Sequence, residues 1–125
     1  MTPAFGRAIP VLRSFDEDKA REFYLDFLGF SVDFEHRFAP DLPLFMQVSR
    51  GGLVLRLSEH HGDGSPGANV TVQATGLDAL RDELLAKAYR YARPGIEEMP
   101  WGTREFRVTD PFGNRLVFEE RAPAP

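Results

Sequence analysis

The residues best suited to chemistry in this chain gather in one segment, RLSEHHGDGSPG, at positions 56–67. It holds His60 and His61, two of the three histidines, with Glu59 before them and Asp63 after. Imidazole and carboxylate groups are the usual protein ligands of divalent cations, so the segment could form a metal site. Adjacent side chains on an extended strand point to opposite faces, however, and the two histidines share a cation only within a turn. The alternatives are a hydrogen-bonded polar loop, or a loop in which one histidine reaches a ligand at a pocket mouth.

The composition is that of one ordinary globular domain. The chain has 125 residues, 42% hydrophobic and 27% charged, which suits a single soluble domain. A net charge of -4 without any basic run argues against a nucleic-acid partner. The lack of cysteine excludes disulfides and thiolate chemistry. With no apolar stretch near the roughly 20 residues of a membrane span and no signal-peptide core, we expect a cytoplasmic protein without a membrane partner.

The first half of the chain predicts one helix among four strands. The helix, at residues 15–30, ends at Gly29 and has apolar residues at amphipathic spacing: Ala20, Phe23, Tyr24, Phe27 and Leu28. We expect the strands at residues 7–14, 30–38, 44–49 and 53–58. Strict alternation in the second strand predicts one shared face for Phe30, Val32, Phe34, His36 and Phe38.

The same order of elements then starts again. We expect a strand at 69–74, a helix at 76–88, and strands at 89–94, 103–109 and 115–120. The segments GGLVLRL and FGNRLVFE match at an offset of about 60 residues, as expected of an internal repeat. The repeat halves cover about 5–62 and 67–121, and residues 122–125 should form a loose tail. The predicted fold class is α+β, with two βαβββ repeats forming curved sheets around a shared cavity.

Two motifs resemble the vicinal oxygen chelate superfamily, which includes glyoxalase I, extradiol dioxygenases and bleomycin-resistance proteins. They are FDEDKAREFYLDFLGF, with its aspartate, FY and LGF, and TDPFGNRLVFEE, with its DPxGN turn and final strand. The segments LSEHHGDGSPGA and RYARPGIEEMPWGTREFRVTDPFGNRLVF resemble the bleomycin-resistance-like branch. That resemblance implies a homodimer whose protomers, sometimes by exchanging halves, frame crevices for small organic ligands. The fold hosts several chemistries, so it does not by itself assign an activity.

The resemblance also implies where metal ligands would lie. Counting from the two motifs places the four positions at Ile9, Arg56, Asn69 and Val117. None of these side chains is a good ligand for a divalent cation, and the Arg56 guanidinium would repel one. We therefore predict no metal, no cofactor and no catalytic residue at the family's metal site. The chain also lacks a GxSxG elbow, a phosphate loop and a dinucleotide fingerprint.

Without a metal, the predicted cavity is a place for an organic ligand. Arg56 and Glu119 are expected to face it, either as an ion pair or as two ends of a site for a polar or zwitterionic ligand. Trp101 lies in a turn, where an indole can stack on a planar compound. The predicted ligand-binding residues are Arg56, Ser58, Asn69, Trp101, Glu119, Phe38, Phe45 and His60.

Three functions remain open at this point. The preferred hypothesis is a metal-free protein that binds and sequesters a small planar, possibly cationic, compound such as a bleomycin-like antibiotic. The alternative is a glyoxalase- or dioxygenase-type enzyme whose atypical metal site would draw on His36, Glu59, His60, His61 or Asp63. The third is an interaction or scaffold protein with a filled cavity.

Overall fold

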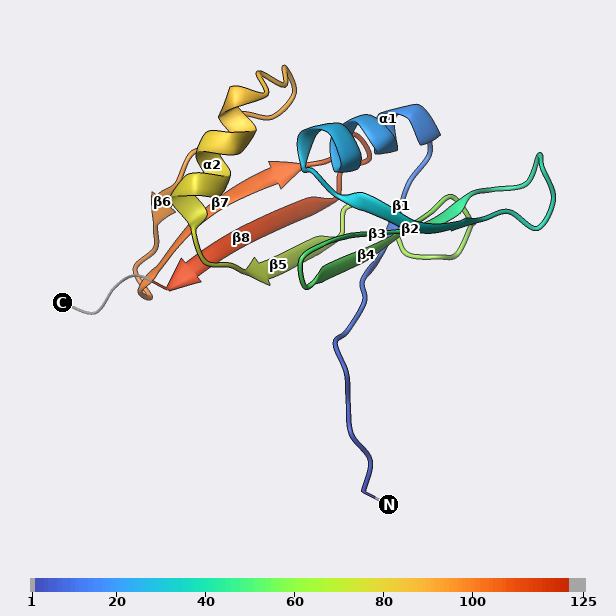
Figure 1. The fold of residues 1–125 in the computed structure, drawn as a ribbon, viewed down its shortest axis with the longest axis horizontal. Helices are drawn as coiled ribbons and strands as arrows, with labels where there is room; N and C mark the ends of the chain where they lie inside the picture. The colour runs from blue at the N-terminus through green and yellow to red at the C-terminus, as the bar shows by residue number, and fades with distance from the viewer. Residues whose placement is uncertain (1, 122–125) are drawn as a thin grey trace.

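The computed structural model describes residues 2–121, which form two modules with the same order of elements (Figure 1). The first module comprises β1 (Val11–Arg13), α1 (Glu17–Arg21) continuing as the π-helical turn η1 (Glu22–Phe27), β2 (Ser31–His36), β3 (Phe45–Arg50) and β4 (Leu53–Ser58). The second comprises β5 (Asn69–Gln73), α2 (Leu77–Ala86), β6 (Glu97–Glu98), β7 (Thr103–Thr109) and β8 (Arg115–Arg121). The predicted α+β class with two βαβββ repeats is confirmed. The predicted tail at 122–125 lies outside the described residues.

The two sheets have equivalent topologies. Their strand orders are β1-β4-β3-β2 and β5-β8-β7-β6. In each sheet the first strand pairs in parallel with the fourth, and the remaining pairs are antiparallel. The helices of both modules lie on the same side of the sheets (Figure 1). Each sheet therefore has one face covered by a helix and an opposite face, called here the open face.

Alternation along the strands explains which side chains enter the core. In β3 and β4 the buried apolar side chains are Met46, Val48, Leu55 and Leu57. Their neighbours in the sequence point to the open face, because successive strand residues alternate. Helix residues complete the core, including Phe23, Tyr24, Phe27, Leu77 and Leu84.

A buried hydrogen-bond network around the DPFGN turn joins the two modules. The Tyr24 hydroxyl donates to Asp110 at 2.6 Å, and burial beside that carboxylate raises the pKa of Tyr24 well above its ordinary value. The Asn114 amide donates to Asp110 at 2.9 Å and to the Arg13 carbonyl at 2.8 Å. Its oxygen accepts from the Ala68 backbone N–H at 3.3 Å. The turn thus ties the end of β1 to the start of β5.

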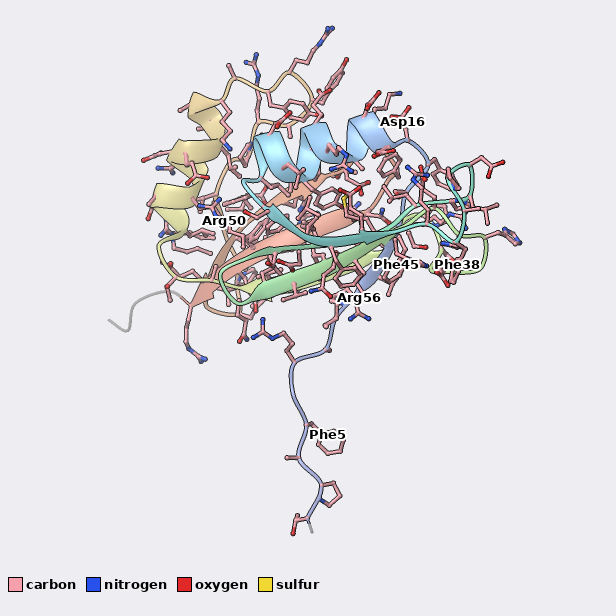
Figure 2. The ribbon with its side chains drawn as sticks, turned by 45° about the vertical axis from the view of Figure 1, so that its right-hand side comes forward. Phe5, Asp16, Phe38, Phe45, Arg50 and Arg56 are labelled. Carbon is pink, nitrogen blue, oxygen red and sulfur yellow. The ribbon has the colours of Figure 1, made fainter. Side chains whose placement is uncertain are left out.

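The first strand is shorter than predicted. The sequence predicted a strand at 7–14, whereas β1 covers only Val11–Arg13. Pro10 has no N–H to donate to a ladder, although its carbonyl accepts from the Arg56 N–H at 2.9 Å. The preceding residues leave the molecule as an extended arm on the side opposite the helices, and Phe5 on this arm is 96% exposed (Figures 1 and 2).

A β-bulge corrects the predicted face of the second strand. The register of β2 against β3 shifts between Val32 and Phe34, so one residue is inserted into the alternation. Val32 packs against the core, while Phe34 and His36 turn to the open face opposite Gln47 and Phe45. The prediction that Val32, Phe34 and His36 share one face was therefore wrong.

The predicted strand at 89–94 is also wrong. The chain there forms a turn and irregular backbone, and the strand of this region is the two-residue β6. Pro94 cannot donate to a ladder, and the Tyr89 ring stacks 4.8 Å from Phe27 instead of joining a sheet. Among the described residues, no helix is long and apolar enough to cross a membrane.

Candidate functional site

The open face of the first sheet presents an ordered row of side chains across all four strands. Phe34 lies opposite Gln47, Gln47 opposite Arg56, and Arg56 opposite Val11. The next row contains His36, Phe45, Ser58 and Arg13. This face therefore combines aromatic, amide and guanidinium groups, which suits recognition of a small polar ligand.

Arg56 is held in place by a side chain from the neighbouring strand. Its Nε donates to Gln47 Oε1 at 3.0 Å, and its guanidinium lies 5.9 Å from the centre of the Phe45 ring. The Gln47 amide donates in turn to Asp33 at 3.0 Å, and the Ser49 hydroxyl donates to the other Asp33 oxygen at 2.8 Å. These bonds from Gln47 and Ser49 lower the pKa of Asp33.

Aromatic rings extend this surface towards the loop between β2 and β3. Phe34 and Phe45 stack with ring centroids 6.2 Å apart and an interplanar angle of 26°. On the loop, Phe38 is 75% exposed and lies edge-on to His36 at 4.5 Å and to His60 at 5.9 Å. Figure 2 shows Phe38, Phe45 and Arg56 on the same half of the molecule. The structure thus brings together four of the predicted site residues, as two pairs: Arg56 with Phe45, and Phe38 with His60.

Ser58 has a structural place beneath the histidine loop. It is fully buried, its hydroxyl donates to Asp63 at 2.9 Å, and it accepts from the His60 N–H at 3.1 Å. The Glu59 carboxylate accepts from the Leu44 N–H at 3.0 Å. These contacts are those of a hydrogen-bonded polar loop, because Asp63 bonds within the segment and Glu59 ties it to the residue before β3.

The second sheet carries a row of acidic groups on its open face. Gln73 lies opposite Glu119, Glu119 opposite Glu105, and Glu105 opposite Glu97. Glu105 is buried, and the nearest cation to it is the Arg107 guanidinium at 3.8 Å. Glu119 and Arg56 lie on different sheets, and no ion pair within 4 Å joins them.

The other predicted ligand-binding residues lie apart from the Arg56 surface. Asn69 is exposed at the start of β5, and Trp101 is 68% exposed in the turn between β6 and β7. Both belong to the second module, as Glu119 does. A ligand that contacts Arg56 within one chain would therefore have to bridge the two sheets to reach them.

A cleft of about 1030 Å³ separates the two modules. The Arg50–Glu83 ion pair, at 2.7 Å, lies at its border and links β3 to α2. None of the predicted ligand-binding residues Arg56, Ser58, Asn69 and Glu119 lines this cleft. The remaining lining is largely apolar and includes Leu28, Phe30, Val54, Val72, Leu80 and Phe118.

Of the four positions implied for a metal, only Asn69 carries a side-chain oxygen. Arg56 and Val117 lie on the fourth strands of their sheets, while Ile9 and Asn69 lie at or before the first strands. Within residues 2–121, no group of three His, Asp or Glu side chains is arranged to hold a metal ion. His36 and His60 flank the Phe38 ring, which places an aromatic edge between them.

Two mixed four-stranded sheets with repeated βαβββ topology define a vicinal-oxygen-chelate fold, as the sequence motifs predicted. The chain matches, over residues 2–124, the family model described as glyoxalase superfamily protein. It therefore belongs to the glyoxalase superfamily.

Solved structures support the same assignment. The chain is 31% identical to a bleomycin-binding protein from bleomycin-producing Streptomyces verticillus, complexed with copper(II)-bleomycin. That match has a TM-score of 0.68 and covers 98% of this chain and 100% of that one. A bleomycin resistance determinant encoded on the transposon Tn5 is 23% identical, with a TM-score of 0.73 and coverage of 94% and 98%, and supports the fold alone. A search of curated proteins found no significant match.

Sequence reasoning missed three residues of the Arg56 surface, namely Asp33, Phe34 and Gln47. Gln47 alternates with the buried Met46 and Val48, so the period of β3 could have placed it on the open face. Phe34 could not be placed, because the bulge that reorients it depends on pairing with β3.

Proposed function

We propose that this protein binds a small planar organic compound on its open faces and holds it without chemical change. The observation that carries this proposal is the row containing Phe34, Gln47 and Arg56, with Phe45 beside it. Stacked rings next to a fixed guanidinium recognise flat, polar molecules through area and hydrogen bonding together. A protein of this kind protects by mass action, because bound compound is withdrawn from solution.

The relatives suggest the type of compound. The protein at 31% identity was solved with copper(II)-bleomycin, so a bleomycin-like antibiotic is the first candidate. The acidic row of Glu97, Glu105 and Glu119 could receive a cationic part of such a ligand. The ligand-binding roles of Ser58, Asn69, Trp101, Phe38 and His60 remain part of this proposal.

We infer that the working unit is a homodimer. The open faces and the extended arm with Phe5 leave aromatic side chains in water in the single chain, and a second copy could cover them. Two copies related by twofold symmetry could place the first sheet of one protomer near the second sheet of the other. The cytoplasm remains the compartment we expect from composition.

The direct test is a calorimetric titration with metal-free and copper(II)-bleomycin, repeated by fluorescence of Trp101. Phe45→Ala should weaken binding about tenfold, since a stacked aromatic pair contributes roughly 0.5–1.5 kcal/mol beyond the area it buries. Tyr91→Ala is the matched control, because Tyr91 is an exposed ring that packs on Tyr89. Absence of binding by the native protein would reject bleomycin as the ligand. Equal losses in the two variants would reject the Arg56 surface as the site.

The enzyme hypothesis has its own test. Elemental analysis of protein purified without an affinity tag should detect no stoichiometric divalent metal. A bound metal that disappears in His60→Ala would favour a metal-dependent enzyme over sequestration.

A further inference from the structure

The side chains around Arg56 point to a narrower ligand class than planar polar compounds in general. We infer that Arg56, oriented by Asp33 through Gln47, binds the anionic group of an aromatic ligand that stacks beside Phe45. This inference rests on the proposed function, because it names the chemistry of the same surface. It makes Arg56 a binding residue and Asp33 a positioning residue.

The direction of each hydrogen bond follows from Asp33. An ionised carboxylate only accepts hydrogen bonds, and bonds from Gln47 and Ser49 keep the pKa of Asp33 low. The Gln47 amide must therefore turn its NH₂ group towards Asp33, at 3.0 Å. Its carbonyl oxygen is then left facing Arg56 Nε, also at 3.0 Å. The charge state of Asp33 thus fixes which end of Gln47 meets the guanidinium.

Gln47 leaves part of the guanidinium available. Arg56 uses Nε on Gln47, and its two terminal NH₂ groups have no hydrogen bond or ion pair to any side chain of residues 2–121. Terminal guanidinium nitrogens match the two oxygens of a carboxylate, or two oxygens of a sulfonate or phosphate. Asp33 does not neutralise Arg56 directly, because no contact within 4 Å joins them. The free hydrogen-bond donors therefore favour an anion.

Neighbouring groups reinforce this preference. Arg13 lies in the adjacent row of the same face, opposite Ser58, and one of its terminal nitrogens donates to the His60 carbonyl. These two rows carry two cations, Arg13 and Arg56, while the nearby acids are already bonded, Asp33 to Gln47 and Ser49 and Asp63 to Ser58. The Phe34–Phe45 stack continues beside Arg56, so a ring and its acidic substituent could be held at once. Figure 2 shows Arg56 beside Phe45, on the side of the sheet from which the arm departs.

Two dyes that differ by one acidic group provide the test. The probes are 8-anilinonaphthalene-1-sulfonate and N-phenyl-1-naphthylamine, which share the same rings but differ in the sulfonate. In fluorescence titrations, Arg56→Gln should weaken binding of the sulfonate dye about tenfold, because it removes a charged hydrogen bond on a partly buried surface. It should change binding of the neutral dye by less than about twofold. Arg90→Gln is the matched control, because it removes the same charge from an exposed position after α2, away from both open faces.

The positioning role of Asp33 has a separate readout. Asp33→Asn should weaken binding of the sulfonate dye about threefold and leave binding of the neutral dye unchanged. It should also shift the NMR signals of the Gln47 amide and the Arg56 Nε–H. Asn can donate as well as accept, so Gln47 would no longer be held in one orientation. Thermal unfolding of each variant checks that the fold is intact. Arg56→Lys supplies a second variant, which keeps the positive charge but loses the planar guanidinium group. We expect this variant to bind the sulfonate dye at an intermediate affinity.

The outcomes separate this inference from the proposed function. Equal effects of Arg56→Gln and Arg90→Gln on binding of the sulfonate dye, or equal losses for both dyes, would overturn the anion site. Unchanged NMR signals in Asp33→Asn would overturn the positioning role. If Arg56→Gln selectively weakens binding of the sulfonate dye and the native protein does not bind bleomycin, the anion site is supported and bleomycin is rejected as the ligand. Bleomycin binding with no dye discrimination supports sequestration and rejects the anion site.

Discussion

Asn114 offers the sharpest test of how the two modules are joined. It is fully buried, and its side chain contacts the Arg13 carbonyl, the Asp110 carboxylate and the Ala68 N–H. We predict that Asn114→Ala lowers the free energy of unfolding by about 3 kcal/mol, because each lost hydrogen bond contributes about 1 kcal/mol and leaves a stranded polar group. That loss is a large part of the roughly 5–15 kcal/mol that stabilises a domain.

Asn114→Asp separates hydrogen-bond chemistry from shape. The new carboxyl group fills the same space but, when ionised, cannot donate to the Arg13 carbonyl and lies beside the Asp110 carboxylate, 2.9 Å from the present amide nitrogen. At neutral pH this variant should lose more stability than Asn114→Ala, because like charges are then buried together. Part of the loss should be recovered on acidification, when the new carboxyl group becomes protonated and can donate.

The measurement is urea unfolding followed by far-UV circular dichroism, with a parallel thermal scan. A loss of about 3 kcal/mol corresponds to a fall in Tm of about 10 °C for a domain of this size. Asn69→Ala is the control, since Asn69 is an exposed asparagine at the start of β5, and its removal should change stability by less than about 0.5 kcal/mol. A loss below about 1 kcal/mol in Asn114→Ala would refute the view that this side chain clamps the modules.

Three further predictions concern backbone strain and pH. Ala88 has a left-handed φ of 51° just after α2, so Ala88→Gly should raise the free energy of unfolding by about 0.5–1 kcal/mol in urea titrations. The Arg50 guanidinium holds the pKa of Glu83 below its ordinary value of 4.5. The ion pair therefore stabilises the fold above that pH, and this stabilisation is lost as pH falls through the folded-state pKa. The difference in free energy of unfolding between the native protein and Glu83→Gln should shrink on acidification. Burial raises the pKa of Tyr24 above its ordinary value of 10.0. The contribution of neutral Tyr24 to the free energy of unfolding is therefore complete below pH 10.0 and declines as the pH rises above it. Tyr24→Phe should flatten this alkaline decline, and absorbance titration near 295 nm should show Tyr24 ionising only upon unfolding.

Most of the local elements, and the repeat, could be predicted from the sequence alone. The apolar stripe through Phe23, Tyr24 and Phe27 predicted the first helix, which the structure resolves into α1 and η1. Gly29, predicted as its left-handed end, has a φ of 76°. The two motifs and the similarity between the halves predicted the fold class, because periodicity and turn residues report local conformation directly. Arg56 was also found, because the resemblance to the superfamily places one of its metal-ligand positions there.

Only the tertiary structure decided what surrounds Arg56. The bulge in β2 depends on pairing with β3, and it brings Phe34 to the open face instead of the core. The hydrogen bonds from Arg56 to Gln47 and from Gln47 to Asp33 join three strands, and no single-strand pattern encodes partners that far apart. Tyr89 left the predicted strand because packing against Phe27 outweighed its strand propensity. Register and long-range contact are properties of paired strands, so they emerge only when the sheets form.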